Sequence, residues 1–345
     1  MNLINLVKGI KDERSSRTDL VSSWQEEEIW KGKIRDTFAV IFRTRGCSWS
    51  HSSGCTMCGY HTDTNPYITE DDLKNQLDQA LKRYKGEDIV KIYTSGSFFD
   101  ENEIPTELAT NILTSFEAKK IVVETRPQFI TPDKLKKYSS KVKKLEVAIG
   151  LESSNNFVLK NCINKGFKLE NYLEKRDLIF ENQSLLRTYL LLKPPFLTEK
   201  EAMKDLKDSI IRVSHPDNII SINPVNIQRG SLLEKLWNDR TYRPAWLWSL
   251  LKVISEVDDI DSTVISSTVG LGSERGAHNC DECDPEIVEL IKEFNLTQDV
   301  EPIKSRLKDP DCSCYYQWKK ESELEPYLNF RGRVGILSDR YAGYV

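Results

Sequence analysis

The sequence predicts an α/β protein built on a partial (βα)6 barrel, followed by a small cysteine-rich, metal-binding C-terminal domain. Three observations support this prediction: six apolar runs alternate with helix-like segments, helix-start signals follow several of those runs, and the cysteines gather in two groups. Strands that alternate with helices form parallel sheets through right-handed crossovers. Six units are too few to close an eight-stranded barrel, so we expect an open one.

The expected strands follow one another along the first three quarters of the chain. They are residues 38–44, 89–95, 120–125, 145–150, 185–192 and 218–224. Their apolar character on both faces is typical of strands that are covered on both sides. Thr69, Thr131 and Thr198 are expected N-caps, because Asp72 and Glu201 complete capping boxes and a proline follows Thr131.

The strand and helix alternation ends near residue 258, where glycine and cysteine become frequent. We therefore expect three regions in the chain. They are an N-terminal helical extension (1–34), the barrel (35–260) and a C-terminal cysteine-rich domain (261–345).

The composition is that of an ordinary soluble protein of 345 residues, with 39% apolar and 30% charged residues and a net charge of -4. No apolar stretch is long enough to span a membrane, and the charged N-terminus has no signal-peptide core. We expect a cytoplasmic protein. Because the cytosol keeps thiols reduced, its eight cysteines are better explained as metal ligands than as disulfides.

Cys47, Cys55 and Cys58 lie close together directly after the first expected strand. Three thiolates are one ligand short of a closed structural zinc site, whereas an iron–sulfur cubane held by three cysteines leaves one iron free to bind another molecule. In barrels of this kind the active residues lie at the C-terminal ends of the strands, where Cys47 is expected. The alternative is a zinc site completed by His51 or His61.

The triad and the strand ends YTSGSFFDENE, VVETRP, AIGLESS and INPVNIQRG resemble the radical S-adenosylmethionine (SAM) superfamily. The similar branch is that of the archaeosine synthase radical SAM component (RaSEA), related to the elongator catalytic subunit. The resemblance covers about residues 35–260 and extends to the C-terminal cysteines. The Cys-x7-Cys-x2-Cys spacing differs from the commoner Cys-x3-Cys-x2-Cys, and Met57 replaces the usual aromatic residue.

This resemblance implies a radical SAM barrel in which the triad holds a 4Fe-4S cluster and the open iron binds SAM. Reductive cleavage of SAM then supplies a 5′-deoxyadenosyl radical. The implied reaction is that of a tRNA-modifying lyase, which cleaves a C–N bond in the side chain of a lysine-modified deazaguanine base and leaves archaeosine. The implied partners are tRNA, the lysine-transferring archaeosine synthase subunit and an external electron donor.

The strand ends supply the expected contacts to SAM. These residues are Ser95, Gly96, Ser97, Glu124, Arg126, Glu152, Ser153, Arg187 and Asn223. Glycine lets the backbone approach a ligand closely, and a charge beside an apolar strand is costly unless it is paired or faces a ligand. Glu124 and Glu152 are expected at the ribose or amine and Arg187 at the carboxylate. The alternative is a structural ion pair between Arg126 or Arg187 and one of these glutamates.

The second cysteine group is expected to hold structural zinc, because four thiolates can close a tetrahedral site. Its members are Cys280, Cys283, Cys312 and Cys314. A second iron–sulfur cluster is the alternative. Nearby candidates for nucleic-acid contacts by stacking and charge are Tyr315, Tyr316, Trp318, Lys319 and Arg331. The aromatic residues among them are equally suited to forming the core of the metal site.

Two other functions remain open from the sequence. The first is a radical SAM enzyme of the elongator-like branch that acts on another tRNA base or on a small molecule, which activity on a free nucleoside would favour. The second is a non-catalytic, zinc-dependent RNA-binding protein, which a colourless preparation with two zinc ions would favour.

Overall fold

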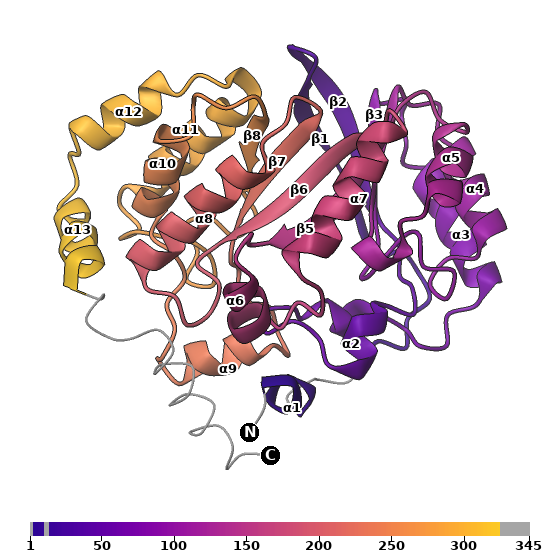
Figure 1. Ribbon diagram of the computed structural model, residues 1–345, viewed down its shortest axis with the longest axis horizontal. Helices are drawn as coiled ribbons and strands as arrows, with labels where there is room; N and C mark the ends of the chain where they lie inside the picture. Colours follow the sequence, from indigo (N-terminus) through magenta and orange to yellow (C-terminus); the bar gives the residue numbers. More distant parts are fainter. Residues whose placement is uncertain (1–2, 10–13, 325–345) are drawn as a thin grey trace.

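The computed structural model describes residues 3–9 and 14–324, and it confirms an open α/β barrel built on one eight-stranded sheet (Figure 1). The strands lie in the sheet in chain order. β1 and β2 are antiparallel, and every later pair is parallel. The strands are β1 Ser22–Trp30, β2 Lys33–Ile41, β3 Ile89–Tyr93, β4 Lys120–Glu124, β5 Leu145–Glu152, β6 Leu185–Leu192, β7 Asn218–Pro224 and β8 Thr263–Ser266.

Helices cover the outer face of this sheet. Figure 1 shows α3, α4 and α5 along one flank, α7 and α8 across the middle strands, and α10, α11 and α12 along the other flank. The helices are α1 Leu3–Lys8, α2 Ser48–Ser52, α3 Glu70–Leu81, α4 Thr106–Thr114, α5 Pro132–Ser139, α6 Asn156–Val158, α7 Leu169–Glu181, α8 Glu199–Val213, α9 Leu232–Asn238, α10 Leu247–Ser255, α11 Asp284–Thr297, α12 Glu301–Lys308 and α13 Cys314–Leu324. Short turns of 3-10 helix lie at Tyr60–Asp63 and Pro127–Phe129, and a π-helical turn lies at Leu159–Ile163.

The three expected N-caps are confirmed. The Thr69 hydroxyl accepts a hydrogen bond from the Asp72 N–H at 3.2 Å, and the Asp72 carboxylate accepts one from the Thr69 N–H at 2.9 Å. Thr198 forms the same box with Glu201. Thr131 caps α5. Helices α3, α5 and α8 therefore begin where their sequences predict.

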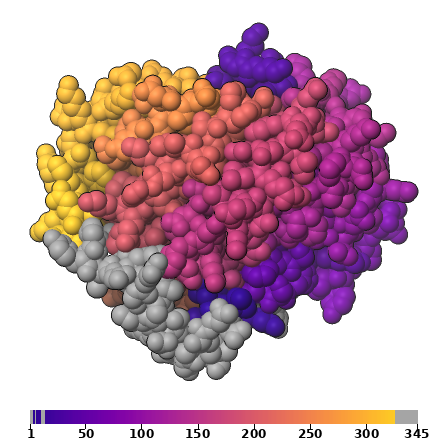
Figure 2. Space-filling model, viewed as in Figure 1, coloured from indigo at the N-terminus to yellow at the C-terminus, as the bar shows by residue number. Residues whose placement is uncertain are grey.

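The N-terminal region differs from the expected helical extension, because residues 22–30 form strand β1. Lys31 and Gly32 both have positive φ, +52° and +66°, as a two-residue type I′ hairpin turn requires. Figure 2 shows this hairpin, in indigo, projecting from the end of the molecule away from α1 and α2. The prediction failed here because β1 is rich in glutamate, whose burial depends on partners from distant strands.

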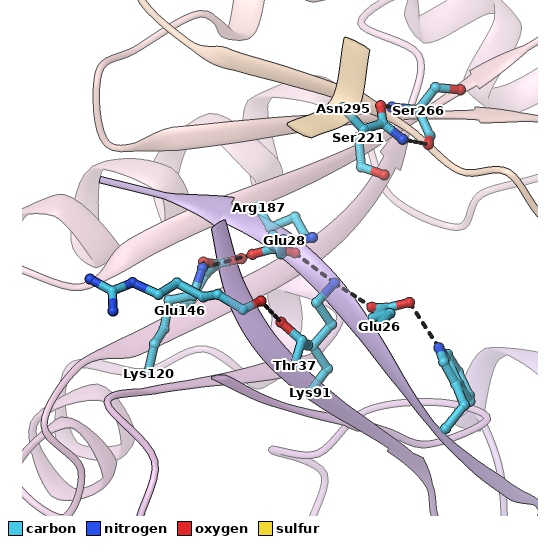
Figure 3. Close-up of polar contacts among 12 residues, drawn as sticks. Glu26, Glu28, Thr37, Lys91, Lys120, Glu146, Arg187, Ser221, Ser266 and Asn295 are labelled. Atoms are coloured by element: carbon cyan, nitrogen blue, oxygen red, sulfur yellow. Dashed lines mark hydrogen bonds and ion pairs between the residues drawn. The ribbon is translucent and has the colours of Figure 1, made fainter. Parts of the chain in front are cut away.

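Those partners form a buried ion-pair network inside the barrel (Figure 3). Glu28 of β1 lies 2.6 Å from Lys91, 2.9 Å from Lys120 and 2.7 Å from Arg187. Glu146 of β5 pairs with Lys120 at 2.7 Å and with Arg187 at 2.5 Å. β1 is thereby tied through its side chains to β3, β4 and β6.

The other edge of the sheet lies beyond residue 260, where the barrel was expected to end. The backbone N–H and carbonyl of Ser266 in β8 bond to the side-chain amide of Asn295, both at 2.8 Å (Figure 3). Gln298 pairs in the same way with Val264. Two amide side chains from the end of α11 thus occupy the free edge of β8. Because α11 also packs against β1, it bridges the two edges of the open barrel.

None of the helices in the described ranges is long and apolar enough to span a membrane.

Candidate active site and metal centre

The cysteine triad lies at the C-terminal end of the parallel strands, in the connection between β2 and α3. All three cysteine residues are partly exposed. Cys47 precedes α2, and its N–H donates a hydrogen bond to the Ser95 carbonyl at 3.2 Å, which joins the triad to the end of β3. Burial and the nearby charge of Cys55 raise the pKa of the Cys58 thiol to about 12.

The long gap between Cys47 and Cys55 is held by the segment that follows β5. The Trp49 indole N–H donates to the Asn164 carbonyl at 2.8 Å, and the Asn164 amide donates to the Gly54 carbonyl at 2.7 Å. The Thr56 N–H donates to the Ile163 carbonyl at 2.9 Å. Gly166, with a φ of +78°, lies so close to Trp49 that a Cβ atom would come within 2.6 Å of its ring. We call residues 162–166 the clamp segment.

A second segment holds the other side of the triad loop. Gln228, which follows β7, accepts a hydrogen bond from the Gly59 N–H at 2.7 Å and also bonds the Tyr60 hydroxyl. The Leu233 N–H donates to the Thr56 carbonyl at 3.1 Å. The Tyr60 side chain remains 54% exposed. The turn that carries Cys55 and Cys58 is therefore fixed between the ends of β5 and β7.

The expected Ser95, Gly96 and Ser97 follow β3 and lie beside the triad. The Ser97 N–H donates to the Glu103 carboxyl at 2.7 Å, and the Ser97 hydroxyl accepts from the Arg126 N–H at 3.1 Å. A Cβ atom on Gly96 would lie 2.0 Å from the Glu103 carboxyl, so a side chain here would displace that group. Burial raises the pKa of Glu103 to about 8.

Glu124, Arg126 and Glu152 come together near the triad. The Glu124 carboxyl accepts from the Thr94 N–H at 2.8 Å, and burial raises its pKa to about 8. The Arg126 guanidinium lies 5.9 Å from the Trp49 ring and donates to the Lys165 carbonyl at 3.1 Å. Glu152 pairs with Lys165 at 2.7 Å. Glu152 therefore forms its ion pair with a lysine rather than with either arginine considered from the sequence.

Three other expected SAM contacts lie in different surroundings. The buried Ser153 hydroxyl donates to Asp205 of α8 at 2.9 Å, so its side chain joins a strand to an outer helix. Arg187 belongs to the buried network, where it pairs with Glu28 and Glu146 (Figure 3). Arg187 therefore forms a structural ion pair, but with Glu28 and Glu146 rather than with Glu124 or Glu152 as the alternative expected. Asn223, partly exposed in β7, accepts from the Ser221 hydroxyl at 3.1 Å.

The second cysteine group forms a compact site. The Sγ–Sγ distances are 3.8 Å for Cys280 and Cys283, 3.4 Å for Cys280 and Cys312, and 3.6 Å for Cys283 and Cys314. All four sulfurs lie within 4.8 Å of one another. The Trp248 indole N–H donates to the Cys314 sulfur at 3.2 Å and the Asn279 amide to the Cys283 sulfur at 3.4 Å, so nitrogen donors reach two of the four thiols.

Neither histidine considered for the triad completes a comparable site. Within residues 3–9 and 14–324, the C-terminal cysteines are the one group of three or more metal-binding side chains whose ligand atoms gather this closely. The His51 ring lies 3.0 Å from the Arg45 carbonyl and 3.1 Å from Arg14.

Two of the aromatic residues near the second site form its core. Trp318 is buried and donates to the Ser249 hydroxyl at 2.8 Å, and Tyr315 packs edge-on against Trp248. Tyr316 is 65% exposed, and Lys319 is also exposed. Arg331 lies outside the described residues.

Sequence reasoning missed several residues that shape the triad site, chiefly Trp49, Glu103, Lys165 and Gln228. Trp49 carried little signal, because its contact Gly166 is distant in the sequence. Lys165 and Gln228 carried none, since each follows a strand that is distant in sequence from the triad.

The fold and these two sites define an open α/β barrel protein with thiols at its mouth and a separate four-cysteine centre. No protein-family model matches the chain. It is 35% identical over 337 residues to the archaeosine synthase subunit beta of Methanosarcina acetivorans, covering 94% of this chain and 96% of that protein. It is 34% identical to the subunit beta of Thermococcus kodakarensis, covering 87% and 97%. The chain belongs to the archaeosine synthase subunit beta family, which confirms the resemblance noted in the sequence.

Solved structures with a similar arrangement are more distant. Queuine lyase from Clostridium spiroforme, bound to SAM and queuine, has 20% identity and a TM-score of 0.43, covering 63% of this chain and 90% of that one. Elp3 from the archaeon Methanocaldococcus infernus has 17% identity and a TM-score of 0.46, covering 75% and 62%.

Proposed function

We propose that this protein is a radical SAM lyase of tRNA modification. It cleaves the C–N bond in the side chain of a lysine-modified deazaguanine base and leaves archaeosine in the tRNA. The observation that carries the proposal is the partly exposed triad at the barrel mouth, in a chain that is 35% identical to an archaeosine synthase subunit beta.

The residues at the mouth fit a 4Fe-4S cluster with one open iron. Three partly exposed cysteine residues lie in one braced loop, and Arg126 and Lys165 place positive charge near Cys55, which offsets the charge of thiolate ligands. When bound, the cluster and SAM supply a 5′-deoxyadenosyl radical by one-electron reduction. The residues that would orient SAM are Ser95, Gly96, Ser97, Glu124, Arg126, Glu152 and Asn223.

We propose zinc for the second site on the basis of its sulfur separations. A tetrahedral site with metal–sulfur bonds of about 2.3 Å has sulfur–sulfur edges of about 3.8 Å. The three Sγ–Sγ distances given above, between 3.4 and 3.8 Å, match this size. A cubane would need wider separations, because each thiolate would bind a different iron.

The name subunit beta, carried by both relatives, supports a complex with a second archaeosine synthase subunit that supplies the lysine-modified tRNA. An external one-electron donor completes the set of proposed partners, since the reaction starts by reduction.

The test is to reconstitute the protein anaerobically and incubate it with SAM, a reductant and lysine-modified tRNA. We expect archaeosine in the tRNA, and loss of both iron and activity in Cys55→Ala. Cys162→Ala is the matched control, because Cys162 is a buried cysteine of the clamp segment whose carbonyl, rather than its thiol, bonds Thr56.

Three results would contradict the proposal at different levels. Unchanged tRNA alongside normal SAM cleavage would contradict the substrate. Conversion of a free nucleoside instead of tRNA would favour the elongator-like alternative. A protein that binds zinc at both sites and takes up no iron would favour a non-catalytic RNA-binding protein.

A further inference from the structure

The Lys165–Glu152 ion pair lies next to the loop that carries the middle cysteine of the triad, Cys55. Its Nζ and Oε1 atoms are 2.7 Å apart, and the two side chains are only 9% and 10% exposed. The residues on both sides of Cys55 are hydrogen-bonded to the clamp segment: Gly54 to Asn164 and Thr56 to Ile163. Lys165 comes next in that segment, so the backbone holds the pair beside Cys55.

The geometry of β5 indicates that the pair is built into the site. The register of β5 against β6 shifts between Gly150 and Glu152, and Glu152 has a φ of +74°, an uncommon conformation for a residue with a side chain. A Cβ atom on Gly150 would lie 2.6 Å from the Glu152 carboxylate and 3.1 Å from the Lys165 ammonium. A residue with positive φ and a glycine thus lie where Glu152 meets Lys165.

The electrostatics at Cys55 agree with this placement. The positive charges of Lys165 and Arg126 and the negative charge of Glu152 are close enough to interact with Cys55. Arg126 is fixed to the same unit, because its guanidinium donates to the Lys165 carbonyl at 3.1 Å. Two cations and one anion therefore act on the position of Cys55.

We propose that the Lys165–Glu152 pair sets the reduction potential of the cluster held by the triad. This inference rests on the cluster assignment within the proposed function. One-electron reduction by an external donor adds a negative charge to the cluster and its thiolates. A neighbouring positive charge favours that added electron and a neighbouring negative charge opposes it, with little screening where the groups are buried. The two members of the pair therefore shift the potential in opposite directions.

The experiment is an anaerobic redox titration of the reconstituted full-length protein, monitored by electron paramagnetic resonance in the absence of SAM. Lys165→Met, which leaves Glu152 without its cation, is expected to shift the potential to a more negative value. Glu152→Gln, which leaves Lys165 without its anion, is expected to shift it to a more positive value. Lys165→Arg should keep the potential near that of the wild type, and Lys165→Met combined with Glu152→Gln should fall between the single variants.

Lys160→Met is the matched control, because Lys160 is an exposed lysine shortly before the clamp segment. The inference is overturned if Lys165→Met and Glu152→Gln shift the potential in the same direction, or if neither shift exceeds that of Lys160→Met. If Lys165→Met takes up no iron, Glu152→Gln and Lys165→Arg still decide the outcome. Wild-type protein that takes up no iron contradicts the proposed function and the inference together, whereas a loaded protein with an unmoved potential contradicts the inference alone.

Discussion

Among individual residues, Glu28 shows how the interior of this barrel differs from an apolar core. Burial alone raises the pKa of a carboxyl group, but Arg187, Lys91 and Lys120 outweigh it and hold the pKa of Glu28 well below its usual range. Glu28 keeps its negative charge because three cations, each from a different strand, lie beside its carboxylate. Removing one cation therefore leaves buried carboxylates undercompensated.

Replacing Arg187 by Met should destabilise the fold by about 3–5 kcal/mol, because Glu28 and Glu146 would both lose a buried partner. Denaturant unfolding measures this loss. Arg212→Met, at an exposed position on α8, should change the free energy of unfolding by less than about 0.5 kcal/mol. Equal losses in the two variants would show that the network contributes nothing specific.

Glu103 makes the stability dependent on pH. Its carboxyl group accepts hydrogen bonds from the Thr44 hydroxyl and the Ser97 N–H, both at 2.7 Å, and burial raises its pKa from 4.5 to about 8. The folded protein therefore binds this proton more tightly than the unfolded chain does. The corresponding stability is complete below about pH 4.5 and is lost as the pH rises through about 8.

Glu103→Gln should flatten this part of the pH dependence, because the amide cannot ionise. The free energy of unfolding between pH 5 and 9 is the measurement, with the exposed Glu107→Gln as the control. Burial also raises the pKa of Glu124 to about 8, so Glu124 still contributes to the pH dependence of the free energy of unfolding in both variants. An unchanged slope in Glu103→Gln would contradict the assignment.

Among the structural elements, the clamp segment turns an unusually long cysteine loop into a fixed one. Gly166→Ala should lower iron incorporation, because its Cβ atom would meet the Trp49 ring at 2.6 Å. Gly86→Ala is a close control, since Gly86 has a φ of +93° but open space around it. Both variants place an alanine at positive φ and share that backbone strain. A difference in iron content per chain therefore reports the clash with Trp49.

The four-cysteine site joins the starts of two helices. Cys283 is the N-cap residue of α11, and Cys314 is the first residue of α13. Cys312→Ser should abolish binding of one zinc per chain and lower the thermal stability, because metal binding contributes to folding. Metal analysis and thermal unfolding test this, and Cys162→Ser should keep the zinc. A variant that retains full zinc would place the metal elsewhere.

On the scale of the whole molecule, the parallel centre of the sheet was predictable and its two edges were not. The runs 185–192 and 218–224 coincide with β6 and β7, because strands buried on both faces read as continuous apolar segments. β1 was not predictable because it is rich in glutamate, and the partners of its buried glutamate come from distant strands. β8 was not predictable because it has only four residues. Its edge is completed by side chains at the end of α11, which lie far along the sequence.

The candidate site was predictable where the chemistry restricts the residue type. The four thiols of the second centre gather as expected, since their spacing allows one tetrahedral site. The neighbours Glu152 and Ser153 were both expected at the cofactor; Glu152 lies near the triad, paired with Lys165, whereas Ser153 contacts Asp205 of the outer helix α8. A bulge decides which way each side chain points, and nothing in the local sequence marks its position.

The bridging position of α11 has a consequence for synthesis on the ribosome. Roughly 250 residues separate β1 from α11, and at about 5–20 residues per second their translation takes on the order of tens of seconds. During that interval the nascent hairpin lacks α11, which packs against β1 in the folded protein. Its glutamates remain hydrated while they wait, and their charge discourages pairing with strands of other chains. We therefore expect the charge of this strand to limit aggregation of the unfinished protein before the strand anchors the interior.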